Sequence, residues 1–217
     1  MISLVIADDH PLFRSALSGA LRAEIQGIEI VESHDLDSTI KCLEKTNDLD
    51  LLLLDLNMPG SGEMYGLIRI RKDFPDVPVA IISGSEDSVM VSNVIDAGAL
   101  GFIPKTSEPS TYVQAINAIL AGDIWLPEDL KEAVANQPKS DLSMQMKVAE
   151  LTPQQYKVLC YLHEGLLNKQ IAYELSISEA TVKAHITAIF RKLEINNRTQ
   201  AVLVASQLKL QMVSVTN

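Results

Sequence analysis

The first half of the chain alternates short apolar runs with amphipathic stretches. The apolar runs are nearly continuous, which is typical of strands covered on both faces of a sheet, and they span residues 2–7, 28–32, 51–56, 77–83 and 100–104. The stretches between them repeat apolar residues with the period of a helix, as do Phe13, Leu17 and Leu21. Five strand–helix units with short connections predict a doubly wound α/β domain with a parallel sheet.

The pattern changes after Gly122. Residues 123–137 indicate a short extra helix, and residues 138–145 indicate a linker. Only helical patterns follow: one helix from Thr152 and Pro153 to Gly165, one capped by Asn168, one capped by Ser178, and one over about Thr199 to Leu210. The second and third of these are separated only by residues 176–178, which is the short connection of a helix-turn-helix.

Charge divides the chain in the same way. The net charge is −10, which alone argues against a nucleic-acid partner, but residues 1–140 carry 22 Asp and Glu against 10 Lys and Arg. Residues 151–217 carry 7 Lys and Arg against 4 Asp and Glu. An acidic first part and a mildly basic second part indicate two domains with different partners.

The remaining composition favours a soluble protein of a reducing cytosol. No apolar run approaches the roughly 18 residues of a membrane span, and the N-terminus lacks the pattern of a signal peptide. Cys42 and Cys160 are single and far apart, so we expect buried small hydrophobes rather than a disulfide or a metal site. We expect Trp125 to pack the extra segment against the sheet domain.

Polar side chains follow the predicted strands at the points where each strand ends. Asp8 and Asp9 end the first strand, Asp55 ends the third, Ser83 ends the fourth, and Lys105 follows the fifth. Because the carboxyl ends of parallel strands meet at one edge, we expect these groups to converge. Two unit charges at about 4 Å repel by about 4 kcal/mol at an effective dielectric near 20, so a cation and Lys105 are needed to balance the carboxylates. Oxygen ligands favour Mg²⁺, and a carboxylate held there is a competent nucleophile toward a phosphoryl group.

Simpler interpretations remain open for each residue alone. The Asp8–Asp9 pair could cap the first helix, and Asp55 could be a solvated loop residue. Residues 60–66, "GSGEMYG", resemble a loose dinucleotide fingerprint, but they follow the third strand instead of the first. A phosphohydrolase with an aspartyl nucleophile would carry a second Asp two residues on, where Asn57 stands.

The third helix of the second domain has two distinct faces. Its inward stripe is apolar, and its opposite face is small or basic, as a helix that reads the DNA major groove should be, with Lys183, Ala184, Thr187 and Arg191. Thr181, His185 and Lys192 flank this face and could reach phosphates, although His185 could equally be a packing residue. Lys169 begins the preceding helix and could hold the DNA backbone with that helix's N-terminus.

Several motifs carry a resemblance to a known family. The segments "DDHPLFR", "LLLLDLNMPG", "AIISGS" and "GFIPK" resemble the receiver domain of bacterial two-component response regulators. The segment from Leu151 to Val202 resembles the LuxR-type helix-turn-helix. The combination is typical of the NarL/FixJ class. It implies a flavodoxin-like receiver over residues 1–122 with sheet order 2-1-3-4-5, an extra helix and linker over 123–147, and an all-α DNA-binding domain over 148–217.

The resemblance assigns roles at the edge of the sheet. Asp55 would be the phosphoacceptor, and the metal would be held by Asp8, Asp9, Asp55 and the backbone carbonyl of Asn57, whose side chain would tune dephosphorylation. Ser83 and Lys105 would bind the phosphoryl oxygens. Phe102 would be the switch aromatic that turns inward when Ser83 moves, changing the face formed by the fourth helix and fifth strand.

The resemblance also implies partners. A histidine kinase or a small phosphodonor would phosphorylate Asp55 in the bacterial cytoplasm, and the active protein would bind double-stranded DNA through Lys183 as a homodimer. The last helix would carry the dimer contact, through Leu203 and Leu208, with Val204 in the core. The implied protein is not an enzyme, although it could slowly dephosphorylate itself. A regulator that ignores phosphorylation and uses its receiver as a dimeriser or ligand sensor is the main alternative.

The chain departs from the family pattern in three places. The family pattern M-P-G-x-x-G is replaced by "MPGSGEMYG", so Gly62 and Gly66 are out of register and we expect a remodelled loop. Pro104 precedes Lys105, and Thr106 follows it, so the cis bond that many receivers make after this lysine is not expected. Gln154 and Gln155 stand where the family usually has Arg and Glu.

Overall fold

The computed structural model describes residues 2–46, 48–62, 64–138, 142–208 and 210. Five strands form one sheet with all neighbours parallel and with the order β2-β1-β3-β4-β5, which confirms the predicted fold class. The strands are β1 Ile2–Ala7, β2 Ile28–Ser33, β3 Leu51–Asp55, β4 Val79–Ser83 and β5 Gly101–Pro104. They match the five predicted apolar runs to within two residues at each end.

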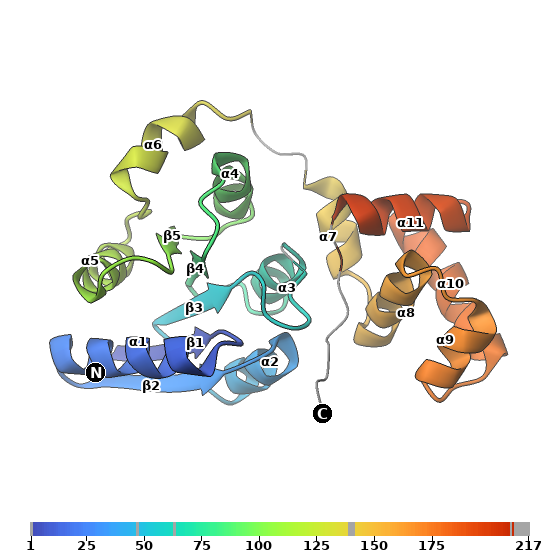
Figure 1. Ribbon diagram of the computed structural model, residues 1–217, viewed down its shortest axis with the longest axis horizontal. Helices are drawn as coiled ribbons and strands as arrows, with labels where there is room; N and C mark the ends of the chain where they lie inside the picture. Colours follow the sequence, from blue (N-terminus) through green and yellow to red (C-terminus); the bar gives the residue numbers. More distant parts are fainter. Residues whose placement is uncertain (1, 47, 63, 139–141, 209, 211–217) are drawn as a thin grey trace.

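Helices cover both faces of the sheet (Figure 1). They are α1 Pro11–Glu24, α2 Leu36–Lys45, α3 Tyr65–Asp73, α4 Ser88–Asp96 and α5 Pro109–Leu120. Alternate residues of β3 point to opposite faces: Leu51 and Leu53 pack with α1 and α5, whereas Leu52 and Leu54 pack with α2, α3 and α4. All four leucines are fully buried, which explains why this strand reads as a continuous apolar run.

The extra segment after Gly122 packs back onto the sheet domain. Trp125 donates its backbone N–H to the Leu100 carbonyl and accepts from the Phe102 N–H, so the chain adds a short bridge beside β5. The Trp125 side chain packs against the core between the sheet, α1 and α5, as predicted. Helix α6, Glu128–Ala135, then lies against α4.

The second half is entirely helical within the described residues. Its helices are α7 Ser143–Ala149, α8 Pro153–His163, α9 Asn168–Glu174, α10 Glu179–Leu193 and α11 Arg198–Gln207. The linker prediction for residues 138–145 is therefore wrong from Ser143 on, because Val148 and Ala149 are buried and anchor these residues as a helix. Residues 139–141 of that linker lie outside the described part.

The ends of these helices largely follow their sequence signals. Thr152 accepts a hydrogen bond from the Gln155 N–H at 3.3 Å, and the Gln155 side chain accepts from the Thr152 N–H at 3.0 Å. Gln155 thus completes a capping box at the position where the family usually has Glu. Asn168 was expected to cap α9, but Leu167 is the cap residue, and its N–H is bound by the Gln170 side chain at 2.7 Å.

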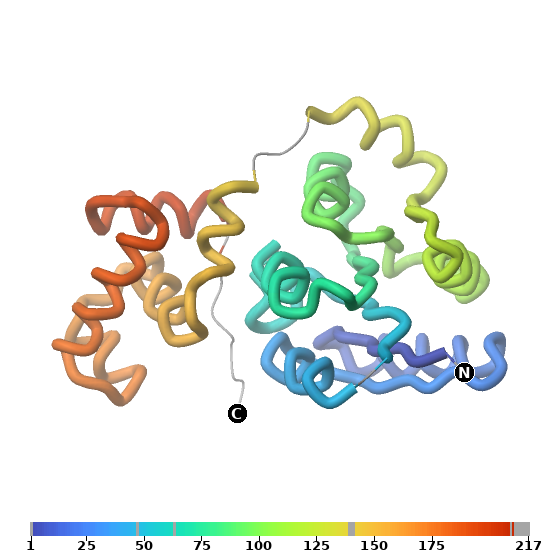
Figure 2. The backbone as a smooth tube through the Cα atoms, turned by 180° about the vertical axis from the view of Figure 1, so that it is seen from behind, coloured from blue at the N-terminus to red at the C-terminus, as the bar shows by residue number. Residues whose placement is uncertain are grey.

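The two halves of the chain are in contact. Helix α7 runs beside α3, and both views show these two helices side by side (Figures 1 and 2). Helices α9 and α10 lie on the side of the second domain away from the sheet domain (Figure 1). None of the helices in the described residues is long and apolar enough to cross a membrane.

Candidate functional site

The polar groups predicted at the carboxyl edge of the sheet do converge. Asp8 follows β1 and Asp55 ends β3, and both residues are fully buried. Lys105 follows β5 and places its ammonium nitrogen 2.6 Å from Asp8 Oδ2 and 2.9 Å from Asp55 Oδ2. One ammonium group therefore joins two carboxylates from different strands.

Burial and pairing oppose each other at this site. Burial by itself would lower the pKa of Lys105, but its hydrogen bonds to Asp8 and Asp55 outweigh this and leave its pKa raised. Burial raises the pKa of Asp55; the hydrogen bond and charge of Lys105 oppose this only in part, and the nearby Asp8 carboxylate raises the pKa further. The carboxylates are therefore undercompensated, so a further cation would be favourable beside them.

The donor set fits a metal ion. Asp8, Asp9, His10 and Asp55 each offer one ligand atom, and these atoms all lie within 4.8 Å of one another. Asp9 Oδ1 is buried and makes no hydrogen bond within the described residues, although His10 Nδ1 lies 2.6 Å away as an ion-pair contact. The acidic cluster could therefore bind a metal ion, and its carboxylate oxygens suit a hard divalent cation.

His10 is the member of this cluster that sequence reasoning missed. Its backbone N–H donates to Asp8 Oδ1 at 2.7 Å, and its ring Nδ1 lies 3.1 Å from the same oxygen. The sequence could have indicated His10 as a ligand, because this histidine directly follows the Asp8–Asp9 pair. His10 is also the residue that precedes α1, and no side chain caps that helix. The alternative that the two aspartates cap α1 therefore has no support in the structure.

Asn57 follows β3, Ser83 ends β4, and Phe102 lies on β5, the strand that Lys105 follows. The Asn57 side chain is exposed at the rim, and its backbone N–H donates to Asp55 Oδ1 at 3.2 Å. Ser83 is buried next to the site, and its hydroxyl accepts a hydrogen bond from the Ser85 N–H at 3.2 Å. Phe102 is fully buried in the core on the α4 side of the sheet, so its ring already points inward in this structure.

The described residues of the loop that departs from the family pattern, 60–62 and 64–66, make close contacts. Gly60 and Gly62 have positive φ angles of 84° and 39°, which glycine adopts readily. The Gly66 N–H donates to the Ser61 carbonyl at 2.7 Å, and a Cβ placed on Gly66 would lie 2.6 Å from Ser61 Oγ. Gly66 is therefore needed for the close approach of Ser61, and a loop shape that differs from the family's stays a prediction.

The second domain presents the predicted basic face. Lys183, Ala184, Thr187 and Arg191 are all exposed on α10, and Thr181 and Lys169 are exposed at the starts of α10 and α9. His185 is half-buried, as is expected for a residue at the edge of this face. Helix α10 packs against α7, α8 and α9, while the face that carries Lys183 is open.

Lys192 is placed differently from the other predicted phosphate contacts. Its ammonium donates to the Glu150 carbonyl at 2.7 Å and to the Gln155 side chain at 2.9 Å. These bonds tie the end of α10 to the start of α8. The structure therefore gives Lys192 a role in holding the domain together.

The predicted dimer helix is only partly free. Leu203 on α11 is 55% exposed, whereas Val204 is buried in the core as expected. Leu208 is half-buried and, with Leu210, lines a small cavity that also includes Met64 and Tyr65 of the first domain. The end of α11 therefore faces the sheet domain in this arrangement.

Two family models match the chain. The response regulator receiver domain matches residues 4–117, and the bacterial regulatory proteins of the luxR family match residues 149–205. Together they cover the two halves described above. They also match the two regions that carried the resemblance in the sequence.

Similar proteins share both halves. The glycerol metabolism activator of Pseudomonas putida is 43% identical over 213 residues, covering 96% of this chain and 96% of that protein. The nitrate/nitrite response regulator protein NarP of Escherichia coli is 34% identical, covering 94% of each chain. RcsB of Salmonella enterica serovar Typhimurium, solved bound to promoter DNA with a phosphomimetic, has a TM-score of 0.57 at 26% identity over 95% of this chain and 98% of that one.

The receiver fold, the second helical domain and the relatives thus agree over nearly the whole length. Phosphorylation typically activates regulators of this kind, and those with a DNA-binding domain typically act as transcription factors. The chain belongs to the family of transcriptional response regulators that join a receiver domain to a LuxR-type DNA-binding domain.

Proposed function

We propose that the chain is a transcription factor of the bacterial cytoplasm, switched by Mg²⁺-dependent phosphorylation of Asp55 and not itself an enzyme. Residues 1–122 would form the receiver, residues 123–147 the segment with the extra helix, the linker and most of α7, and residues 148–217 the DNA-binding domain. The observation that carries the proposal is the single ammonium of Lys105 held 2.6 Å from Asp8 and 2.9 Å from Asp55.

The chemistry follows from that geometry. An oxygen of the Asp55 carboxylate attacks the phosphorus of the donor, and the bond between phosphorus and the donor's leaving group breaks. A bound Mg²⁺, held by Asp8, Asp9, Asp55 and the Asn57 carbonyl, would neutralise charge on the phosphoryl oxygens. Lys105 is already beside the acceptor and can pair with a phosphoryl oxygen, and Ser83 can donate its hydroxyl to another.

We propose a histidine kinase or a small phosphodonor such as acetyl phosphate as the source of the phosphoryl group. The new group adds about −1.5 to −2 charges at pH 7, which draws Lys105 and Ser83 toward it. Because Phe102 already points inward, its ring does not have to cross from the surface in this structure. The face of α4 and β5 would then respond through the displacement of Ser83.

The DNA-binding step would use the exposed face of α10 as a homodimer. Lys183, Ala184, Thr187 and Arg191 would enter the major groove, while Thr181, His185 and Lys169 would contact phosphates. Since this face is open in the structure, phosphorylation is not needed to uncover it. We therefore favour a switch that pairs two DNA-binding domains, through Leu203 and Leu208, over one that releases a covered helix.

The experiment compares promoter affinity with and without acetyl phosphate and Mg²⁺, for the natural chain and for Asp55→Asn. We expect tighter binding on phosphorylation of the natural chain only, with a steeper salt dependence because a dimer contacts more phosphates. Equal affinities in all four samples would favour a regulator that ignores phosphorylation. Steady release of phosphate over many turnovers would instead indicate a phosphohydrolase.

A further inference from the structure

One threonine on the exposed face of α10 uses its hydroxyl group inside the helix. Thr187 Oγ1 donates a hydrogen bond to the Lys183 carbonyl at 3.0 Å, one turn earlier in the helix. Threonine side chains bond the helix backbone in this way, and the bond takes up the only proton that a hydroxyl group can donate. Because Thr187 is still exposed, its methyl group is what remains available to a molecule outside the helix.

The neighbours of Thr187 on this face are an alanine and two cations, all of them exposed. Ala184 precedes Thr187 by three positions, so the two side chains are adjacent on the helix surface. Lys183 and Arg191 lie four positions before and after Thr187. Within the part of the chain that the structure describes, neither cation is paired with a carboxylate. The methyl groups of Ala184 and Thr187 therefore form a small apolar spot between two available positive charges.

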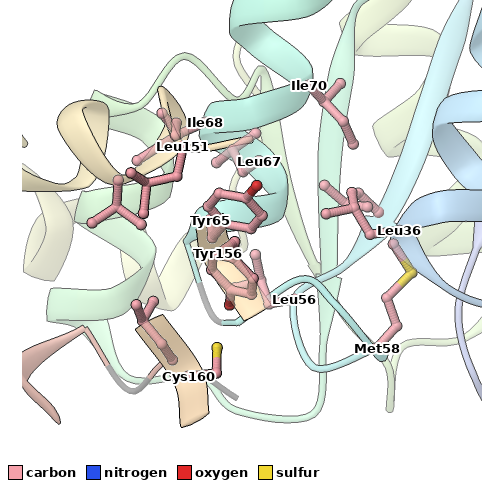
Figure 3. Close-up of a cluster of buried hydrophobic side chains, with 14 of the residues drawn as sticks. Leu36, Leu56, Met58, Tyr65, Leu67, Ile68, Ile70, Leu151, Tyr156 and Cys160 are labelled. Atoms are coloured by element: carbon pink, nitrogen blue, oxygen red, sulfur yellow. The ribbon is translucent and has the colours of Figure 1, made fainter. Parts of the chain in front are cut away.

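This spot is open in the full chain, because the receiver meets the second domain elsewhere. The rings of Tyr65 in α3 and Tyr156 in α8 stack with their centroids 4.0 Å apart, and both residues are buried (Figure 3). Helix α7 also contacts α3, whereas α9 and α10 lie on the side of the second domain away from the receiver (Figure 1). The apolar spot can therefore reach a ligand while the two domains stay packed as they are.

The major groove of DNA offers one group that suits this spot. Thymine presents its C5-methyl group there, and the methyl groups of alanine and threonine are suitable contacts for it. Acceptors such as guanine N7 and O6 match the side chains of Lys183 and Arg191 instead. They do not match the Thr187 hydroxyl group, whose proton is already bound to the Lys183 carbonyl.

We propose that Thr187, with Ala184 beside it, reads the C5-methyl group of a thymine in the DNA site of this chain. The inference rests on the proposed function in that α10 must enter the major groove. It adds which base is recognised at this position and by which atoms. The hydrogen bond to Lys183 is central to it, because this bond directs the donor of Thr187 toward the helix and leaves the methyl group for the base.

The test begins with DNA duplexes that the full chain, incubated with acetyl phosphate and Mg²⁺, selects from a pool of random sequence. In the duplex that binds most tightly, each thymine is replaced in turn by deoxyuridine, which lacks only the C5-methyl group. We expect the replacement at one position of the site to weaken binding about three- to fivefold, as for the loss of one methyl group from an apolar contact. This loss of affinity is called the methyl effect below.

Two variants separate the methyl group of Thr187 from its hydroxyl group. Thr187→Ser keeps a hydroxyl group that can bond the Lys183 carbonyl but lacks the methyl group, so the methyl effect should fall to about twofold or less. Thr187→Val keeps the branched shape and lacks the hydroxyl group, so the methyl effect should remain. Thr199→Ser removes a methyl group from an exposed threonine of α11 and is the matched control. Thermal unfolding checks that each variant is folded.

A methyl effect that Thr187→Ser keeps, or that Thr187→Val loses, would overturn the proposal, because the hydroxyl group or another residue would then read the base. Equal affinity for the thymine and uracil duplexes at every position would overturn it as well. If Lys183→Ala still weakens binding to the selected duplex in that case, the proposed role of α10 in DNA binding stands. If the pool yields no enriched sequence, the DNA-binding step of the proposed function fails, and the thymine contact fails with it.

Discussion

The ammonium nitrogen of Lys105 lies 2.6 Å from Asp8 Oδ2 and 2.9 Å from Asp55 Oδ2, so one cation serves two fully buried carboxylates. The contact joins the ends of β1, β3 and β5. It holds in place the Asp55 carboxylate, which is the proposed phosphoacceptor. It also leaves a deficit of positive charge, and this deficit explains why a metal ion suits the site.

Removal of Lys105 should destabilise the receiver at neutral pH. Lys105→Ala leaves two buried carboxylates without their cation, and we expect the free energy of unfolding to fall by about 3 kcal/mol at pH 7. The pKa of Asp55, already raised by burial, would rise further, so this carboxyl takes up a proton at higher pH in the folded variant. The difference in unfolding free energy between the natural chain and Lys105→Ala should therefore shrink as the pH falls. Urea denaturation at several pH values measures this difference, and Lys45→Ala, a substitution of an exposed lysine, is the control. A difference in unfolding free energy that does not depend on pH would contradict this account.

Mg²⁺ should stabilise the folded chain through Asp9. At a concentration 100 times the dissociation constant, a ligand that binds only the folded state adds about 2.7 kcal/mol to the free energy of unfolding. Asp9→Asn removes one carboxylate from the cluster, so it should lose most of this gain and be at least as stable as the natural chain without metal. Thermal unfolding with and without Mg²⁺ gives both quantities. Equal stabilisation of the two proteins would remove Asp9 from the metal site.

Lys183 and Lys192 provide a matched pair on one helix. Lys183 is exposed on the open face, so Lys183→Ala should weaken promoter binding by about 1–3 kcal/mol and leave stability unchanged. Lys192 is bonded to Glu150 and Gln155, so Lys192→Ala should mainly lower the stability of the second domain. Binding titrations and thermal unfolding of both variants separate the two roles. A loss of affinity for Lys192→Ala with unchanged stability would return Lys192 to the DNA contacts.

Asp35 should give the receiver a pH-dependent helix cap. Its side chain accepts the Ser38 N–H at 2.6 Å at the start of α2. Burial acts to raise the pKa of Asp35, but the hydrogen bonds with Ser38 prevail and lower it below 3.8. The cap therefore stabilises the fold at pH values above 3.8 and loses this effect as the pH falls through the lowered pKa of the folded state. Asp35→Ala should cost about 1 kcal/mol at pH 7 and progressively less in acid, as measured by denaturant unfolding.

Gly66 should tolerate no side chain while Ser61 keeps its own. A Cβ at Gly66 would lie 2.6 Å from Ser61 Oγ, so Gly66→Ala should cost about 1–3 kcal/mol of stability. Ser61→Gly in the same chain removes the opposing hydroxymethyl group and should restore part of the loss. Unfolding of the single and double variants measures this coupling. If the double variant regains none of the stability lost in Gly66→Ala, the backbone of residue 61, and not its side chain, excludes a Cβ at residue 66.

The sequence was sufficient for the sheet and for the convergence of its polar ends. Apolar runs such as Leu51–Leu54 read as buried strands, and parallel strands of known order bring Asp8, Asp55 and Lys105 to one edge. The roles assigned to those residues stay predictions until they are tested. Helix α7 was missed because its seven residues are too short for a periodic signal, and only the burial of Val148 and Ala149 reveals what holds it.

The domain contact could not be foreseen from the sequence. Tyr65 and Tyr156 each fit an amphipathic helix by themselves, and their stacking depends on how two separately folded units dock. The role of Lys192 could not be predicted either. The sequence pattern of a lysine at the edge of α10 fits a DNA contact as well as it fits hydrogen bonds to Glu150 and Gln155. Local periodicity places a residue on a face but does not say what meets that face.

The intact mass of the chain after incubation with acetyl phosphate and Mg²⁺ tests the central claim most directly. The natural chain should gain the mass of one phosphoryl group, located by fragmentation at Asp55, and Asp55→Asn should gain none. An unchanged mass in the natural chain, or an equal gain in Asp55→Asn, would contradict the assignment of Asp55 as the phosphoacceptor.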